Sequence, residues 1–298
     1  MALPVAILIV NYRVYEDLDR ALASLGPALR DDDEVVVYDQ ESHPARVAEL
    51  AARHPRVRWQ VSAANIGFGA AVNRAVTGTT APYLLWLNPD TIVTPGFIDA
   101  LEAWLEAHPD VGCAGPRVMN DDGSVQASAR RFPDISTAIA GRSTWLTRRF
   151  PGNPLSRHNL LARETDRPCT VDWLAGSCVM TRRALFERLG GFDEGFFLYW
   201  EDADYCRRAL ALGFTCAYLP HVTVSHAGGR SAARDPGPAI RAFHASAYRM
   251  FLKHTNLVGR IASPLVWLAL TSRGIVLAGA ARRRARAATS RLRSARPD

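Results

Sequence analysis

Short apolar runs alternate with amphipathic segments along the first 118 residues of the chain. The run Leu84-Leu85-Trp86-Leu87 ends at the polar turn Asn88-Pro89-Asp90. It is typical of a buried strand, because it is short, apolar and bounded by turn residues. The same pattern predicts strands at 5–10, 34–38, 57–61, 84–87 and 111–118, and helices at 16–29, 44–53, 70–76 and 96–107. Such alternation predicts an α/β fold with a largely parallel sheet and helices on both faces.

The regular pattern stops near residue 119. Residues 119–168 hold turn signals and scattered arginines and prolines, and a segment of this length without a pattern of its own is typical of a lid or binding loop. Beyond it the sequence predicts ordered structure at 171–180, helices at 182–189 and 201–212, short strands at 214–219 and 221–226, and mostly helix from there on.

Polar side chains stand at the ends of several predicted strands. They are Asn11, Asp39, Asn88 with Asp90, and His226. Taken alone, a single Asp or Asn in such a place is better explained as a helix cap or a turn residue. Ligands in open α/β sheets bind beyond the carboxyl ends of the strands, so the coincidence of all of them at one edge predicts a nucleotide pocket.

Two further features add to this pocket. The segment Asn65-Ile66-Gly67-Phe68-Gly69 precedes a predicted helix, and its glycines allow close approach of a ligand, although such a turn is weak evidence by itself. Asp90 and His226 together could hold a divalent cation, Mg²⁺ or Mn²⁺, with positions left for phosphate oxygens and water. A buried, hydrogen-bonded role for His226 stays open.

The acidic cluster Glu201-Asp202-Ala203-Asp204 opens a predicted helix, where the macrodipole favours acids. We interpret Asp204 as structural, paired with Arg207 or Arg208 one turn later. Asp202 follows the aromatic run 196–200, which would partly desolvate its carboxylate and raise its pKa toward that of a general base.

Charge and cysteine content limit the alternatives. Six of the seven net positive charges follow Ala281, in a tail with seven arginines and one acid. The five cysteines include no CxxC pair, which argues against a disulfide framework or zinc site and favours a reducing cytoplasm. No charged segment precedes the first apolar run, so we interpret it as a strand and not as a signal peptide.

The ordered set of motifs resembles the family 2 inverting glycosyltransferases of GT-A fold, over about residues 4–256. It comprises Val10-Asn11-Tyr12, Asp39, Asn65-x-Gly-Phe-Gly-x-Ala-x-Asn73, Leu87-Asn88-Pro89-Asp90, Gly176-Ser177-Cys178, Gly191-Phe192-Asp193-Glu194, Glu201-Asp202-x-Asp204 and His226. Within the family it is most similar to bacterial rhamnosyltransferases that act on polyprenyl-diphospho-N-acetylglucosamine. The resemblance implies a GT-A domain at 1–235 and a C-terminal helical region with a basic tail at 236–298.

The resemblance also implies a role for each matching residue. Asp202 would be the catalytic base, and Asp90 and His226 would meet the metal. The nucleotide sugar would be held by Asn11, Asp39, Asn65, Gly67, Asn73 and Asn88. The acceptor would be held by Trp173, Gly176, Ser177 and Glu201. The family's Asp-Asn-x-Ser after the second strand is Asp39-Gln40-Glu41-Ser42 here, so the contacts to the base differ in detail.

By the same resemblance, the reaction would transfer L-rhamnose from dTDP-L-rhamnose to N-acetylglucosaminyl-diphospho-polyprenol. This step begins the linker between peptidoglycan and arabinogalactan in the cell wall. Composition and spacing do not distinguish rhamnose from other hexoses, so a UDP- or GDP-sugar donor stays open. A basic-tailed nucleic-acid binder is disfavoured by the near-neutral body of the chain, and a dinucleotide enzyme by the missing GxGxxG.

Residues 257–280 are apolar but contain Arg260, Pro264 and Arg273. Because charge in mid-bilayer is costly, we interpret the segment as lying in the membrane interface and not as spanning it. The arginine-rich tail would bind the anionic inner leaflet of the cell membrane. This predicts a cytoplasmic, peripherally membrane-bound enzyme with a lipid-linked acceptor. A solvated tail remains the alternative, and a homo-oligomer is compatible with either.

Overall fold

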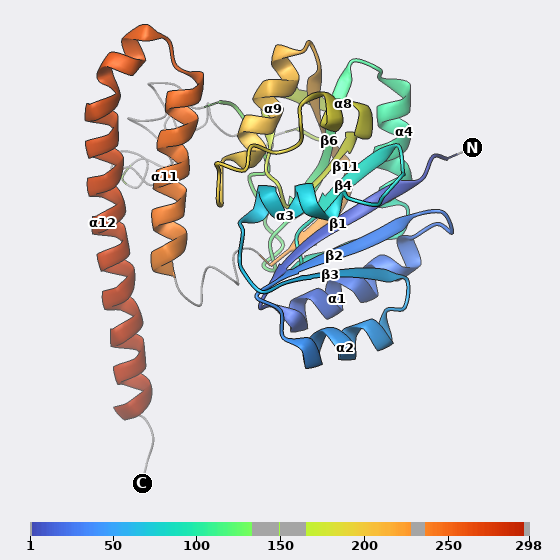
Figure 1. Ribbon diagram of the computed structural model, residues 1–298, viewed down its shortest axis with the longest axis horizontal. Coiled ribbons are helices and arrows are strands. Elements are labelled where there is room, and N and C mark those ends of the chain that lie inside the picture. Colours follow the sequence, from blue (N-terminus) through green and yellow to red (C-terminus); the bar gives the residue numbers. More distant parts are fainter. Residues whose placement is uncertain (1, 133–148, 150–164, 228–235, 295–298) are drawn as a thin grey trace.

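The computed structural model describes residues 2–132, 149, 165–227 and 236–294 (Figure 1). Most of the predicted lid, residues 119–168, lies outside this range. A nine-stranded sheet forms the centre, with β3-β2-β1-β4-β10-β6-β11-β5 in spatial order and β8 paired to β11. Its strands are β1 (Val5–Tyr12), β2 (Glu34–Gln40), β3 (Val57–Ser62), β4 (Tyr83–Leu87), β5 (Thr91–Ile92), β6 (Val111–Met119), β8 (Cys169–Val171), β10 (Cys178–Arg182) and β11 (Thr215–His226).

Strand β1 explains why both faces of the sheet are covered. Its residues 5–10 are all buried, and they alternate between two apolar clusters. Ile7 belongs to the cluster on the face of α1, α2 and α4, whereas Leu8 belongs to that of α3, α8 and α9. These helices are α1 (Tyr15–Leu25), α2 (Pro44–Arg53), α3 (Phe68–Ala75), α4 (Phe97–Ala107), α8 (Arg183–Arg188) and α9 (Glu201–Ala211). The α/β fold with helices on both faces is therefore confirmed.

The order of strands differs from simple βα alternation in one place. β10 lies between β4 and β6 and is antiparallel to both, with Met180 opposite Leu85 on one side and Ala114 on the other. β4 and β6 consequently do not pair, although only β5 and α4 separate them along the chain. Along the chain, β10 follows the long segment after β6. An antiparallel pair of strands needs no crossover helix, so this connection is compatible with its position. A two-stranded sheet of β7 (Ala129–Arg130) and β9 (Trp173–Leu174) lies on this route.

The two short strands expected at 214–219 and 221–226 form one continuous strand, β11. Its register against β6 shifts between Leu219 and Thr223. Pro220 lies within this shift and has no backbone N–H to give to the ladder, which accounts for an irregularity without a break.

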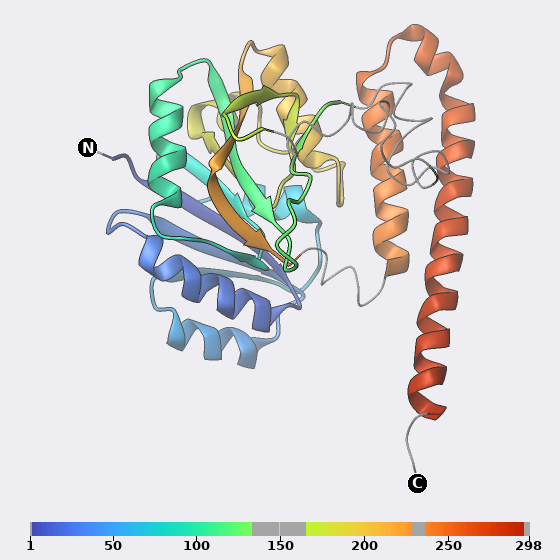
Figure 2. The same cartoon turned by 180° about the vertical axis from the view of Figure 1, so that it is seen from behind.

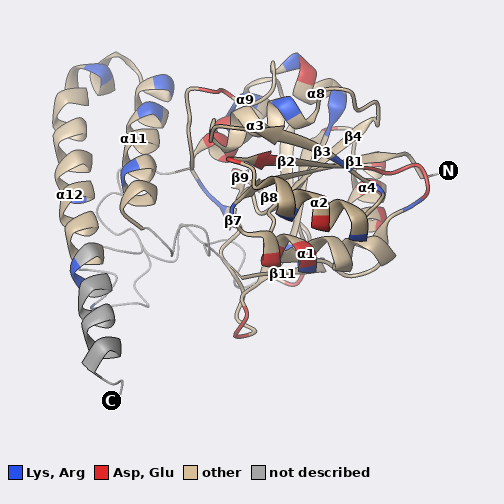
Figure 3. Ribbon diagram, turned by 60° about the horizontal axis from the view of Figure 1, so that its bottom comes forward, with Lys and Arg blue, Asp and Glu red and all other residues tan. Residues whose placement is uncertain are grey.

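The C-terminal region is a helical hairpin that stands beside the sheet domain (Figures 1 and 2). Its helices are α11 (Pro236–His254) and α12 (Leu257–Ser294), and α12 continues through Pro264. Neither helix contains an Asp or Glu residue, so the charged positions on the described hairpin are all basic (Figure 3). Met250 of α11 is buried in the same apolar cluster as α9.

Three of the five cysteines meet in the core, which sequence spacing did not indicate. Cys113 on β6, Cys206 on α9 and Cys216 on β11 are buried, and their sulfur atoms lie within 4.8 Å of one another. All five cysteines are free thiols in the structure.

Candidate active site

Asn88, Asp90 and His226, predicted from separate strand ends, meet in the structure. β5 pairs with the end of β11, with His226 opposite Thr91, and this places the imidazole against the turn after β4. Asp90 Oδ1 lies 3.0 Å from His226 Nε2. The side-chain amide of Asn88 lies 3.1 Å from the same nitrogen. The expected convergence at this edge of the sheet is therefore present for these side chains.

Gln126 determines which ring nitrogen of His226 carries the hydrogen. Its Oε1, which can only accept, lies 2.8 Å from His226 Nδ1, so Nδ1 carries the hydrogen. In the neutral ring Nε2 then presents a lone pair toward the Asp90 carboxylate. Nε2 has only one lone pair, and the Asn88 amide faces it as well, so a cation shared with Asp90 would replace that contact. Sequence reasoning missed Gln126, because it lies in the irregular segment after β6.

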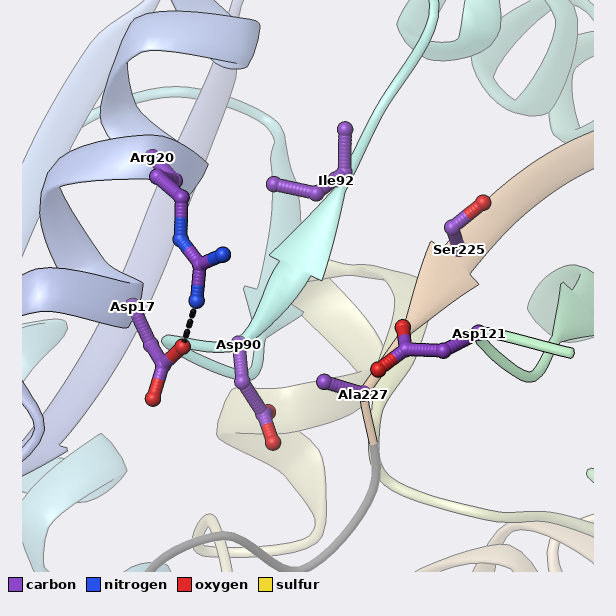
Figure 4. A pocket seen from close by; sticks show the side chains of 7 residues that line it. All are labelled: Asp17, Arg20, Asp90, Ile92, Asp121, Ser225 and Ala227. Atoms are coloured by element: carbon purple, nitrogen blue, oxygen red, sulfur yellow. Dashed lines mark hydrogen bonds and ion pairs between the residues drawn. The ribbon is translucent and has the colours of Figure 1, made fainter.

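A small pocket opens beside Asp90, between α1 and the end of β11 (Figure 4). Three carboxylates line it, from Asp17, Asp90 and Asp121, together with Arg20, which pairs with Asp17. The surplus of negative charge also favours a cation at Asp90. The donor set of one imidazole and carboxylate oxygens suits Mg²⁺ or Mn²⁺.

Asp202 stands in the first turn of α9 and is half-buried. Its Oδ2 accepts a hydrogen bond from the backbone N–H of Gly176 at 2.8 Å, and its Oδ1 accepts one from Ala203 at 2.8 Å. Burial raises the pKa of Asp202 to about 6, although both N–H donors act in the opposite direction. Such a carboxylate is mostly ionised at neutral pH and still basic enough to accept a proton in catalysis.

The dipeptide Gly176-Ser177 connects Asp202 to the Asp90 group. Gly176 donates to Asp202, and the carbonyl of the next residue, Ser177, accepts a 2.9 Å hydrogen bond from the N–H of Asn88. These contacts connect the expected base, through two consecutive residues, to the turn that carries the expected metal ligand Asp90. Gly176 and Ser177, predicted to hold the acceptor, thus lie between the two functional groups.

Glu201, the neighbour of Asp202, is buried, and its Oε2 has no hydrogen-bond partner among the described residues. Burial, and then the nearby charge of Asp202, raise the pKa of Glu201 well above its ordinary value. Glu201 therefore holds a proton more readily than an ordinary glutamate does, and in its protonated form it can donate a hydrogen bond.

Trp173, the remaining residue expected at the acceptor, forms part of an aromatic wall. Its ring stacks on Trp200 with centroids 6.2 Å apart, and its indole N–H donates to the carbonyl of Arg131 at 2.9 Å. The guanidinium of Arg130 lies 4.9 Å from its ring centre. The positive charge of Arg130 also lowers the pKa of Asp202 slightly, so this wall adjoins the carboxylate.

Asn11 and Asp39 are register partners at the ends of β1 and β2. The Asn11 amide donates to Asp39 Oδ1 at 2.6 Å, and the Tyr15 hydroxyl donates to Asp39 Oδ2 at 2.9 Å. Both residues are fully buried, and Asn11 Oδ1 is left without a partner among the described residues. Tyr15 was not singled out from the sequence, because it reads as an ordinary residue of a helix start.

The glycine loop lies where β2 and α3 meet. Asn65 Oδ1 accepts from the N–H of Gly67 at 3.0 Å, and Gln40 Oε1 accepts from Ile66 at 2.8 Å. Gly67 has φ +92°, and a Cβ there would lie 2.4 Å from the carbonyl oxygen of Phe197. Gln40, which departs from the family pattern, therefore fixes the loop in place.

Asn73 is directed elsewhere. Its side-chain amide donates to the carbonyl of Phe192 at 3.0 Å, and its oxygen accepts from the Phe192 N–H at 2.9 Å. These bonds hold the loop before the aromatic run, and the contacts seen for Asn73 give it a structural role. Asp204 is buried and pairs with Arg208 at 2.8 Å, in agreement with the structural role predicted for it.

Comparisons with known proteins agree with this geometry. The sequence model described as glycosyl transferase family 2 matches residues 6–190. N-acetylglucosaminyl-diphospho-decaprenol L-rhamnosyltransferase of Mycobacterium tuberculosis is 34% identical over 87% of this chain and 86% of its own length. Rhamnosyltransferase WbbL of Escherichia coli is 24% identical over 84% of this chain and 90% of its own length.

Solved structures show the same fold. The mannosyltransferase PcManGT from Pyrobaculum calidifontis, in complex with GDP-Man and Mn²⁺, superposes with a TM-score of 0.58 at 17% identity, over 98% of this chain and 80% of that one. GalNAc-T7 with UDP, GalNAc and Mn²⁺ superposes with a TM-score of 0.57 at 17% identity, over 76% of this chain and 43% of that one. The chain therefore belongs to glycosyltransferase family 2 and is an inverting hexosyltransferase of GT-A fold.

Proposed function

We propose that the enzyme transfers L-rhamnose from dTDP-L-rhamnose to N-acetylglucosaminyl-diphospho-polyprenol, the first sugar transfer of the arabinogalactan linker in the cell wall. The observation that carries the transferase chemistry is the Gly176-Ser177 bridge, which joins Asp202 to Asn88 and hence to Asp90 and His226. The choice of sugar and acceptor is supported by the similarity to the two rhamnosyltransferases.

In the proposed reaction Asp202 removes the proton from the attacking hydroxyl of the acceptor. The oxygen of that hydroxyl bonds to the anomeric carbon of the donor from one side, while the bond to the diphosphate breaks on the other. One displacement inverts the anomeric centre. The aromatic wall of Trp173 and Trp200 limits water near Asp202, which disfavours hydrolysis of the donor.

Asp90 and His226 would hold a divalent cation, which supplies charge stabilisation to the departing diphosphate when bound. Asn88 would orient His226 until the cation replaces their contact, and Gln126 would fix its tautomer. For the donor's nucleoside we propose Asn11, Asp39 and the Asn65–Gly67 loop, since all three stand at the same sheet edge. Asn73 would act there only indirectly, through the loop at Phe192.

We propose further that the hairpin docks on the inner face of the cytoplasmic membrane. By length and composition, Leu257–Ala281 could cross a bilayer. However, α11 packs alongside α12 and carries Arg249 and Lys253, which crossing would bring into hydrocarbon unless the helices separated. An interfacial position keeps these charges out of the hydrocarbon and leaves their ion pairs with the sheet domain intact. It also presents Leu257, Ile261 and Leu265, which are 74%, 74% and 72% exposed, to the lipid.

The test is a transfer assay with purified enzyme, a short-chain polyprenyl-diphospho-N-acetylglucosamine and Mg²⁺ or Mn²⁺. We expect transfer from dTDP-rhamnose, loss of transfer with a chelator, and at least about a thousandfold loss in Asp202→Asn, which keeps donor binding. Transfer from a UDP- or GDP-hexose alone would overturn the rhamnosyl assignment. Near-normal turnover of Asp202→Asn would remove Asp202 from the role of base.

A further inference from the structure

The aromatic run before α9 has an unusual backbone. Tyr199 and Trp200 are consecutive residues with positive φ, 67° and 71°, and neither is glycine. Bulky residues adopt this left-handed conformation only where the surrounding structure holds them in it, and such strain gathers at functional sites. Trp200 is the residue before the first turn of α9, and its carbonyl accepts from Asp204 at 2.9 Å. Its backbone angles therefore determine the direction in which the helix presents Asp202.

The contacts that hold this backbone come from two sides. On the side of the sheet domain, Trp200 stacks on Trp173. On the other side are two residues of α11. The Ser246 hydroxyl, which is buried, donates to the carbonyl of Leu198 at 2.9 Å. The ring of Phe243 lies 5.8 Å from that of Tyr199 and 5.6 Å from that of Trp200.

Ion pairs tie α11 to both ends of the same segment. Asp193, which precedes the aromatic run, pairs with Arg249 at 2.8 Å and with Lys253 at 2.6 Å. Lys253 also reaches Asp204, on the first turn of α9, at 2.8 Å. Because Asp204 is fully buried, this pairing is shielded from solvent. Helix α11 therefore contacts this segment at three places: at Asp193 before the strained residues, at the strained residues themselves, and at Asp204 after them.

We propose that Phe243 and Ser246 are positioning residues of the active site, which hold Tyr199 and Trp200 in their left-handed conformation and so orient Asp202 toward the acceptor hydroxyl. The inference rests on the proposed role of Asp202 as base. It makes the C-terminal hairpin a component of the catalytic centre as well as a membrane contact. Helix α11 contacts the segment that positions the base, and α12 presents the exposed apolar face.

The experiment compares Phe243→Ala and Ser246→Ala with the unmodified full chain. A shift of the base by about 1 Å costs on the order of 100-fold in rate, so we expect kcat to fall roughly 10- to 100-fold. The dissociation constant for dTDP, measured by calorimetry, should stay within about twofold, because neither residue touches the donor side. The conservative variant Phe243→Tyr keeps the ring and should restore kcat.

Two further readouts distinguish positioning from general structural damage. Removing the Phe243 ring should let water reach Asp202, which lowers the pKa of its carboxyl group. The acidic limb of the plot of kcat against pH should therefore move to lower pH in Phe243→Ala. In an Asp202→Asn background, Phe243→Ala should cause no additional loss, because its effect passes through that carboxylate. Tyr248→Ala is the matched control: it truncates an aromatic side chain of the same helix that is not among those packed on Tyr199 or Trp200.

Normal kcat in both alanine variants would overturn the inference, and so would a lower kcat with an unmoved pH limb or with an equal further loss in the Asp202→Asn background. A fall in kcat that only parallels a lower unfolding temperature, and is shared by Tyr248→Ala, would overturn it as well. The proposed function fails separately, through an active Asp202→Asn enzyme, and that result does not depend on any variant of α11.

Discussion

Asp202 and Glu201 are adjacent carboxyl groups whose environments separate their chemistry. Glu201 is buried and its Oε2 has no hydrogen-bond partner among the described residues, whereas Asp202 accepts two backbone hydrogen bonds. Burial raises the pKa of both carboxyl groups, and for Asp202 the two backbone donors act against that increase. Neighbouring carboxyl groups in different environments are a common arrangement in sites that move a proton, because the environment determines which of them accepts it.

The pKa of Asp202 predicts how turnover depends on pH. A base must be ionised to act, and the pKa of Asp202 is about 6, so kcat should be constant above neutrality and fall as pH drops through 6. One protonation with this pKa makes kcat about tenfold lower at pH 5 than on the plateau. The measurement is kcat from pH 5 to 8 with both substrates saturating and folding checked by circular dichroism. A profile that stays flat to pH 5 would contradict this assignment.

At this scale, the sequence predicted residues that stand at strand ends and missed those that orient them. Asp90 and His226 follow from the rule that ligand groups gather at the carboxyl edge of a sheet. Gln126 and Tyr15 do not, because their hydrogen bonds depend on how an irregular segment and a helix start are placed in space. Asn73 is a different case. Its position in a motif suggested a ligand, but its amide is occupied by the Phe192 backbone.

The start of α3 illustrates how one element constrains another. Position 67 has no room for a side chain, because a Cβ would lie 2.4 Å from the carbonyl oxygen of Phe197. The φ of Gly67, +92°, is also unfavourable for other residues. The same carbonyl accepts the N–H of Phe68 at 2.9 Å. The loop expected at the donor and the aromatic run beside Asp202 are therefore in direct backbone contact.

We accordingly expect Gly67→Ala to lower the free energy of unfolding by more than about 2 kcal/mol and to weaken donor binding, because the clash is with backbone that cannot move aside. Urea denaturation and calorimetry with dTDP measure the two effects. Gly26→Ala is the control: its φ is −47° and no atom lies within 4 Å of an added Cβ. That change should be neutral or stabilise the fold by up to about 1 kcal/mol. Equal stability of the two variants would refute the argument.

Most elements could be predicted from hydrophobic periodicity, but their pairing could not. The antiparallel insertion of β10 between β4 and β6 is a matter of strand pairing, which leaves no local pattern in the sequence. The continuity of β11 through Pro220 depends on its partner β6, since an isolated proline reads as a break. The meeting of Cys113, Cys206 and Cys216 is also a product of tertiary packing, because no two of them have the spacing of a local motif.

The whole molecule divides its charge between two parts. The sheet domain carries acids around Asp90, whereas the described hairpin carries only bases (Figure 3). The sequence predicted both the apolar segment and the basic tail. It did not predict that α11 would contact the aromatic run, since nothing in the pattern of α11 specifies its partner. The hairpin therefore brings the proposed membrane surface and the proposed base into one connected structure.

This arrangement leads to a prediction about membrane binding. Deleting 282–298 removes seven arginines and leaves Leu257–Ala281 intact. Near an anionic surface each basic residue contributes about 1 kcal/mol, so even two arginines in contact change partition by roughly thirtyfold. We expect the truncated enzyme to dissociate from vesicles that contain phosphatidylglycerol. The full chain should dissociate from the same vesicles at high salt, because salt screens the attraction.

The control is a full-length variant with lysine at all seven positions, which keeps the charge and should stay bound. Unchanged partition of the truncated enzyme, or binding that resists both salt and alkaline extraction, would instead indicate that α12 crosses the bilayer, with α11 separated from it.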